Sequence, residues 1–136
     1  MDSETTRALV QRFIDARTTN DVATIEDLLT DDAVWCPPVS MRSTPFVGRE
    51  AVAKALAGGA AGATFDLSTI KRDVRSITVD GARAVVQLRL TATTHSGIEY
   101  ANEYCWVYTC RDDRVQLLEE YTDTWHAARV LGLNKD

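Results

Sequence analysis

Two long strands are expected in residues 100–125, which read YANEYCWVYTCRDDRVQLLEEYTDTW. The first strand covers Tyr100–Cys110 and the second covers Arg114–Thr124, and the Asp112-Asp113 pair between them fits a tight turn. A half-buried strand normally alternates apolar and polar side chains. These two strands depart from that pattern, because they are crowded with polar and aromatic residues: Asn102, Glu103, Tyr104, Trp106, Tyr108, Glu120 and Asp123.

The crowding of polar groups in this segment has a physical consequence. The segment is long enough to lie centrally in a sheet, and burying polar groups there costs free energy unless they bond one another, water or a ligand. The C-terminal sheet is therefore predicted to form one wall of a pocket that contains several polar groups.

The N-terminal half is predicted to hold three helices, at Ser3–Thr18, Val22–Leu29 and Arg49–Ala57. Ser3 is the expected cap of the first helix. One face of that helix carries Leu9, Val10, Phe13, Ile14 and Arg17 at helical spacing. A short strand, Ala33–Cys36, ends at Pro37-Pro38, since proline donates no hydrogen bond to a neighbouring strand. An irregular loop is expected over Val39–Val47.

The C-terminal half is predicted to contain strands only, followed by a short helix. The expected strands are Thr64–Thr78 with a possible break near Lys71, Arg83–Thr94, Gly97–Cys110 and Arg114–Thr124, and the helix is Trp125–Leu131. Asp80-Gly81 and Ser96-Gly97 are hairpin turn signals. Helices followed by a meander of antiparallel strands indicate an α+β fold, in which a long, bent sheet and its helices form a cone with a pocket inside.

The bulk composition narrows the class of protein. The chain of 136 residues is expected to be one domain, residues 1–136, and its 45% hydrophobic and 26% charged residues are ordinary for a globular fold. A net charge of −5 without a basic patch argues against nucleic-acid binding. No apolar stretch approaches the roughly 20 residues that span a membrane, and the acidic N-terminus is unlike a signal peptide.

Cysteines and histidines give no sign of a metal or a disulfide framework. Cys36, Cys105 and Cys110 are an odd number without metal-ligand spacing, which favours reduced thiols and a cytoplasmic protein. His95 and His126 do not sit at ligand spacing either, so no zinc site is expected. We expect no cofactor and no metal.

The order of four short motifs resembles the NTF2-like superfamily. The motifs are Asp31-Asp32-Ala33-Val34, Gly48-Arg49-Glu50-Ala51-Val52, Asp112-Asp113-Arg114-Val115 and Glu119-Glu120-Tyr121-Thr122-Asp123. The branch they resemble includes the SnoaL-like polyketide cyclases, the ketosteroid isomerases and the limonene-epoxide hydrolases. This resemblance implies a cone with a curved, mostly antiparallel sheet wrapped around about three N-terminal helices, and a short C-terminal helix. It also implies a homodimer, which the aromatic residues on both sheet faces support.

The catalytic residues of the ketosteroid isomerases have no counterparts here. By the resemblance, the position of their carboxylate base falls on Pro37, which is no base. Their two oxyanion donors fall near Phe13 and Cys105, which lack the required acidic groups. Steroid isomerisation by that mechanism is therefore not expected.

The epoxide hydrolases of this fold use an Arg-x-Asp pair, an aspartate in the last strand, and a tyrosine and an asparagine that hold the water. By the resemblance, Arg89 matches the arginine and Thr91 replaces its aspartate. Glu120 takes the last-strand position, and Trp35 and Pro37 replace the tyrosine and the asparagine. One charge pair, Arg89 with Glu120, is retained, so epoxide hydrolysis stays an alternative.

The SnoaL-type cyclases use a pocket acid/base, and Glu120 is the candidate for that role. A lone carboxylate in an apolar cavity suits proton transfer, because burial raises its pKa toward neutrality. The predicted catalytic set is Glu120 with Arg89 as its charge partner and Tyr104 as a donor to a substrate carbonyl. The predicted substrate-binding residues are Trp35, Asn102, Leu118, Phe13, Thr91 and Trp106.

Three hypotheses about function remain, and whether the protein is an enzyme is left open. The first is a cofactor-free isomerase, cyclase or lyase acting on a hydrophobic, carbonyl-bearing or polycyclic small molecule. The second is a ligand-binding or accessory protein, in which Arg89 neutralises a structural Glu120. The third is a dimeric interaction protein with a filled cone. Single residues also have structural alternatives: Asp123 as the cap of the last helix, and Arg89 as a solvent-facing strand residue.

Overall fold

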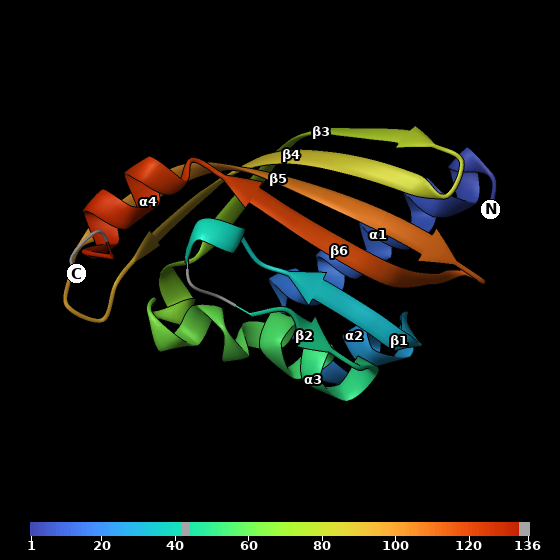
Figure 1. The fold of residues 1–136 in the computed structure, drawn as a ribbon, viewed down its shortest axis with the longest axis horizontal. Helices are drawn as coiled ribbons and strands as arrows, with labels where there is room; N and C mark the ends of the chain where they lie inside the picture. Colours follow the sequence, from blue (N-terminus) through green and yellow to red (C-terminus); the bar gives the residue numbers. More distant parts are fainter. Residues whose placement is uncertain (42–43, 134–136) are drawn as a thin grey trace.

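The computed structural model describes residues 1–41 and 44–133, and it has an α+β architecture (Figure 1). The helices are α1 (Ser3–Thr18), α2 (Val22–Asp27), α3 (Arg49–Lys54) and α4 (Thr124–Leu131). The strands are β1 (Leu29–Cys36), β2 (Phe46–Val47), β3 (Lys71–Asp80), β4 (Arg83–Thr93), β5 (Glu99–Arg111) and β6 (Arg114–Thr122). Within the described residues, no helix is long and apolar enough to cross a membrane.

The six strands form one curved, open sheet in the order β2-β1-β6-β5-β4-β3. Strands β1 and β6 run parallel, and every other neighbouring pair runs antiparallel. The sheet bends over the N-terminal helices, and α4 lies at the far end of the long strands (Figure 1). This arrangement confirms the predicted cone of a mostly antiparallel sheet with a short C-terminal helix.

Helix α1 forms where its apolar face predicts, and it fills the concave side of the sheet. Its apolar face buries Leu9, Val10, Phe13 and Ile14. The expected cap was wrong by one residue, because Asp2 accepts the hydrogen bond from Thr5 N at 2.8 Å. Ser3 has a different use: its hydroxyl oxygen accepts a hydrogen bond from Gly81 N at 2.9 Å.

The long strands alternate cleanly, and this alternation sets which residues enter the cone. On β4, Leu88 and Leu90 are buried against the helices, whereas Arg89 between them is exposed. The register pairs Leu88 with Tyr104 and Val86 with Trp106, which places Tyr104 and Trp106 on the same inner face. The inner residues of β5 are Tyr100, Asn102, Tyr104, Trp106 and Tyr108.

Several predicted boundaries needed correction. Strand β1 begins at Leu29 rather than Ala33, since its irregular pairing with β6 already starts at Leu29. The predicted strand from Thr64 begins only at Lys71, because Asp66 accepts from Ser68 N and closes a short helical turn instead. The predicted loop over Val39–Val47 contains a helical turn and strand β2, and its residues 42 and 43 lie outside the described residues.

Three further helix ends differ from the prediction, and the first is that of α2, which ends at Asp27 because Leu29 already begins β1. Helix α3 ends at Lys54, and a π-helical turn follows in which Gly58 has φ +99°, a conformation that disfavours other residues. The terminal helix begins at Thr124, and the Asp123 carboxylate accepts from His126 N at 3.0 Å. Asp123 is therefore the helix cap that the sequence favoured.

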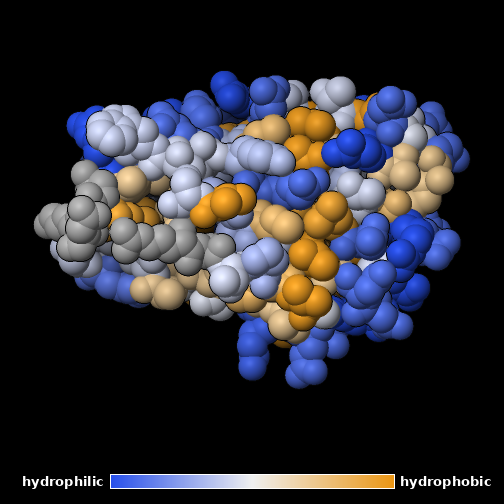
Figure 2. Space-filling model, viewed as in Figure 1, coloured by the Kyte–Doolittle hydropathy of each residue, from blue (hydrophilic) through white to orange (hydrophobic). Residues whose placement is uncertain are grey.

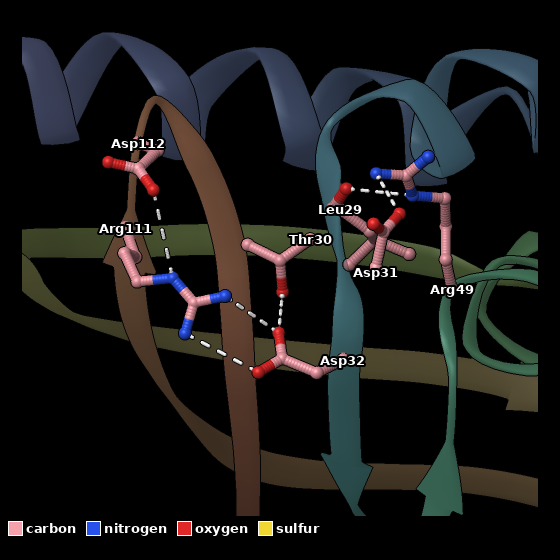
Figure 3. A network of polar contacts seen from close by, with 7 residues as sticks. All are labelled: Leu29, Thr30, Asp31, Asp32, Arg49, Arg111 and Asp112. Carbon is pink, nitrogen blue, oxygen red and sulfur yellow. Dashed lines mark hydrogen bonds and ion pairs between the residues drawn. The ribbon is translucent and has the colours of Figure 1, made fainter.

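The motif residues Asp31, Asp32 and Arg49 hold the base of the cone together (Figure 3). Arg49 donates to the Leu29 carbonyl at 3.1 Å and pairs with Asp31 at 2.7 Å, which ties α3 to β1. Asp32 pairs with Arg111 of β5 at 2.8 Å. The hydrogen bond from Thr30 and the contact with Arg111 lower the pKa of Asp32. We refer to Asp31, Asp32 and Arg49 as the basal clamp.

Candidate functional site

A cavity of about 500 Å³ lies between the inner face of the sheet and the helical side of the cone. This volume is in the range of small-molecule sites. Its wall is mostly apolar and aromatic, and the described residues contribute three charged side chains. The lining residues are Arg17, Trp35, Pro37, Pro38, Met41, Phe46, Ala60, Ala61, Thr64, Phe65, Arg72, Leu90, Tyr104, Trp106, Glu120, Leu131 and Leu133.

Glu120 is the only carboxylate among the described lining residues. Its strand pairs it with Trp106, and the Trp106 indole donates to Glu120 Oε1 at 3.0 Å. Protein atoms surround the carboxyl on most sides, although the residue keeps partial exposure where it borders the cavity. Burial raises the pKa of Glu120, whereas Arg17, the Trp106 hydrogen bond and Arg72 oppose that rise.

Arg17 and Arg72 are the two cations among the described lining residues, and neither was among the predicted site residues. The Arg17 side chain is 4% exposed, and its guanidinium lies 4.0 Å from the centre of the Trp106 ring. Burial, and then the like charge of Arg17, lower the pKa of Arg72 to about 10. Among the described residues, neither guanidinium comes within 4.0 Å of the Glu120 carboxylate.

The sequence did contain a signal for each arginine. Arg17 falls on the apolar face of the predicted first helix, where burying a charge costs free energy unless the charge is paired or hydrogen-bonded. Arg72 alternates in phase with Val74 on β3, and therefore points to the same side of the strand as that apolar residue. A charged residue in the phase of core residues is the pattern that would have identified both.

Tyr104 ends a chain of hydrogen bonds along the inner face of β5. The Asn102 amide donates to the Tyr100 hydroxyl at 2.8 Å and to the Asp123 carbonyl at 2.9 Å. The hydroxyls of Tyr100 and Tyr104 are 2.8 Å apart. If Tyr100 uses its own hydrogen on Tyr104, the Tyr104 hydroxyl can donate into the cavity. Burial raises the pKa of Tyr104, so it stays protonated.

Trp35 and Phe46 form an aromatic part of the cavity wall. Their rings stack with centroids 5.1 Å apart and planes 14° apart, since β1 and β2 place them side by side. Pro37, at the position where the ketosteroid isomerases carry their base, also lines the cavity. That position contributes an apolar surface here and no acid/base group.

Four of the nine predicted site residues line the cavity: Glu120, Tyr104, Trp35 and Trp106. Asn102 shares their face but does not line the cavity. Its amide donates to the Tyr100 hydroxyl and to the Asp123 carbonyl. Phe13 and Leu118 are 0% and 1% exposed and belong to the hydrophobic core. The tight packing between helix and sheet leaves them no exposure to a ligand.

The predicted pairing of Arg89 with Glu120 was wrong, because the two residues lie on opposite faces of the sheet. Arg89 pairs across β4 and β5 with Glu103 and approaches its carboxylate at 3.4 Å on the outer face. Thr91 shares the phase of Arg89 and also faces outward. The structural alternative for Arg89, a solvent-facing strand residue, is the one that holds, since its side chain is 50% exposed.

Comparison with known proteins places this geometry in a family. The sequence matches the SnoaL-like domain over residues 10–117. That match covers most of the chain, so the protein belongs to the SnoaL-like family of the NTF2-like superfamily. No curated protein sequence matches the chain significantly.

Solved structures share the fold at low sequence identity. Bal32a, from a soil-derived mobile gene cassette, is 23% identical with a TM-score of 0.82, over 96% of this chain and 99% of that one. An M. tuberculosis LEH-like epoxide hydrolase is 18% identical with a TM-score of 0.75, over 96% and 92%. TerC, co-crystallized with polyporic acid, is 16% identical with a TM-score of 0.80, over 94% and 98%.

The raised pKa of Glu120 predicts a pH-dependent stability difference between the wild type and Glu120→Gln. A group whose folded-state pKa is raised contributes stability that is fully present below its unfolded pKa and is lost as pH rises through its folded pKa. The free energy of unfolding of the wild type minus that of Glu120→Gln should therefore fall as the pH rises above the ordinary glutamate pKa of about 4.3, by about 1.4 kcal/mol for each unit of pKa rise. Paired thermal melts measure it, and a flat or rising difference would contradict the assigned direction.

Proposed function

We propose that this protein is a cofactor-independent proton-transfer enzyme, an isomerase, cyclase or lyase, that acts on a hydrophobic, carbonyl-bearing or polycyclic small molecule. The observation that carries the proposal is Glu120 in the cavity wall, with its pKa raised by burial and its position fixed by the Trp106 indole. A carboxyl group whose pKa lies closer to neutrality both accepts and returns a proton efficiently.

In this mechanism, Glu120 is the acid/base and Tyr104 is the donor to the substrate carbonyl. The carboxylate takes a proton from a carbon next to the carbonyl, and the electron pair of that C–H bond forms an enolate. The enolate oxygen accepts a hydrogen bond from the Tyr104 hydroxyl, which the chain through Tyr100 and Asn102 orients. The enolate carbon then either takes the proton back from the Glu120 carboxylic acid to form a new C–H bond, or attacks a second carbonyl carbon of the substrate to form a C–C bond while the oxygen of that carbonyl takes the proton.

The family comparisons support a small-molecule role for this chain. TerC was crystallized with polyporic acid, and another structural relative is an LEH-like epoxide hydrolase. Epoxide hydrolysis itself loses support here, because the Arg89–Glu120 pair on which that alternative depended is not formed.

Deuterium exchange tests the proposal without knowledge of the natural substrate. The protein is incubated in D₂O with steroid enones, aromatic polyketide mimics and epoxides that raise its melting temperature, since a ligand of the native state stabilises it by mass action. Deuterium gain or rearrangement of one carbonyl class, detected by mass spectrometry, is the expected result. Binding without exchange or turnover in every class would reject catalysis.

A second candidate is a non-catalytic ligand-binding protein of the same cavity. Arg17 and Arg72 favour it, because their charges oppose the rise in the pKa of Glu120 and so favour its charged form. In that case Glu120 balances the arginines, and its replacement changes affinity without affecting any reaction.

The outer face of the sheet supports the proposal of a homodimer. Strand pairing places an apolar band across this face, and Figure 2 shows apolar residues gathered across its middle. The band has two parts, Val47, Val34 and Leu117 across β2, β1 and β6, and Val107 with Val85 across β5 and β4, and the parts meet diagonally beside Thr109 and Glu119. Multi-angle light scattering should give twice the chain mass for the wild type, and Val107→Glu should shift it to the monomer mass because a charge there opposes burial. A monomeric wild type would reject the dimer.

A further inference from the structure

The charges on the described wall of the cavity do not balance. Among the described lining residues, two are cations, Arg17 and Arg72, and one is an anion, Glu120. The two cations are close enough for the charge of Arg17 to depress the pKa of Arg72. Even with Glu120 ionised, the described wall of the cavity therefore carries one uncompensated positive charge. Burying such a charge is costly unless a counter-charge reaches it.

The hydrogen-bond donors of the same side chains are also incompletely used. Within the described part of the chain, Arg17 Nε and Nη1, Arg72 Nε and Trp35 Nε1 are buried without a well-formed hydrogen bond to a protein acceptor, and the Tyr108 hydroxyl beside Arg17 is buried and unpaired as well. Arg17 is almost fully buried, with only 4% of its surface exposed. Buried donors without acceptors destabilise a protein, so their accumulation around one cavity points to a ligand that supplies acceptors.

We propose that the ligand of this cavity carries a carboxylate, which Arg17 and Arg72 bind, on an otherwise hydrophobic body. A carboxylate supplies one negative charge and two acceptor oxygens, and guanidinium groups match it geometrically. With Glu120 ionised, the two cations and two anions then balance. Apolar side chains such as Leu90, Met41 and Phe65 suit the hydrophobic remainder. This inference rests on the proposed site and names the class of its substrate.

Calorimetric titration with 2-naphthoate and its neutral counterpart 2-naphthamide tests the assignment, because the two probes share their apolar body. We expect the wild type to bind 2-naphthoate at least about tenfold more tightly, the scale of one charge-assisted hydrogen bond. Arg72→Met should abolish that preference by weakening 2-naphthoate alone. Equal affinity of the two probes for the wild type, or no binding of 2-naphthoate at millimolar concentration, would overturn the proposal.

Arg75→Met is the matched control for Arg72→Met. Arg75 lies on the same strand, and it approaches Glu103 at 3.5 Å on the outer face, so this substitution removes the same charge outside the cavity. The control should keep the preference for 2-naphthoate. A preference that survives in Arg72→Met, or that disappears equally in Arg75→Met, would show that the cavity arginines do not select the anion.

Two further variants keep the test decisive. Arg72→Lys keeps the charge at this position and should retain part of the preference, even if Arg72→Met folds poorly. Glu120→Gln should bind 2-naphthoate at least as tightly as the wild type does, because it removes the competing anion. Anion preference without any Glu120-dependent proton transfer would reject the proposed function and keep this inference, whereas proton transfer without anion preference would do the reverse.

Discussion

Glu120→Gln is expected to lower the rate of proton transfer by about 10²–10⁴-fold, the range that a positioned acid/base contributes. Glutamine has the size of glutamate and can still accept the hydrogen bond that the Trp106 indole donates at 3.0 Å. It cannot accept and return a proton, so binding should persist while exchange of the substrate C–H stops. The measurement is the rate of deuterium incorporation into the carbonyl compound that the wild type exchanges, at saturating concentration.

Glu119→Gln provides the matched control for this variant. Glu119 is the preceding residue of β6, pairs with Val107, and lies on the outer face with Tyr121. The same chemical change therefore occurs one residue away, outside the cavity, and the rate should stay within about twofold of the wild type. Equal rates for Glu120→Gln and the wild type would remove Glu120 from the mechanism and leave the ligand-binding alternative.

Phe13→Ala is expected to lower the free energy of unfolding by about 3–5 kcal/mol, a large part of the stability of a domain of this size. Phe13 is fully buried between α1 and the sheet, and its ring meets Tyr108 edge to face at 5.7 Å. The substitution leaves a void that rigid neighbours cannot fill. Urea denaturation followed by circular dichroism gives the change from the shift in midpoint.

Arg12→Ala is the surface control on the same helix, since Arg12 is exposed and should change stability by no more than about 0.5 kcal/mol. Phe13→Leu, which retains most of the apolar volume, should cost only about 1.5 kcal/mol. The sequence suggested Phe13 as a substrate contact, and that role makes the opposite prediction. A Phe13→Ala protein of normal stability with weakened ligand binding would restore the substrate contact and refute the core assignment.

The fold was largely predictable because its signals are local. Helix α1 follows from the spacing of its apolar face, and its bounds Ser3–Thr18 were predicted correctly. Turn residues at Gly81, Gly97 and the Asp112-Asp113 pair have positive φ, which is why they mark hairpins in the sequence. The strand boundaries that failed, at Leu29 and Lys71, depend on irregular strand pairing or on a capped turn, which apolar patterning does not describe.

The candidate site was predictable only in part, because it depends on which way each side chain points. Glu120 and Tyr104 followed from polar residues in a central segment, and the phase of the strands then placed them inside. Arg89 was misplaced, since a register one residue different exchanges the two faces of a strand. Arg17 and Arg72 come from α1 and β3, and only the folded cone brings them to one cavity.

The basal clamp has a consequence for how relatives of this protein are to be compared. Asp31, Asp32 and Arg49 belong to the motifs that reveal the family, yet none of them lines the cavity. The family match ends at residue 117, before Glu120. Resemblance in the basal clamp therefore reports the shared fold and does not identify the ligand. Sorting members by the residues at positions 17, 72 and 120 should group them by ligand chemistry.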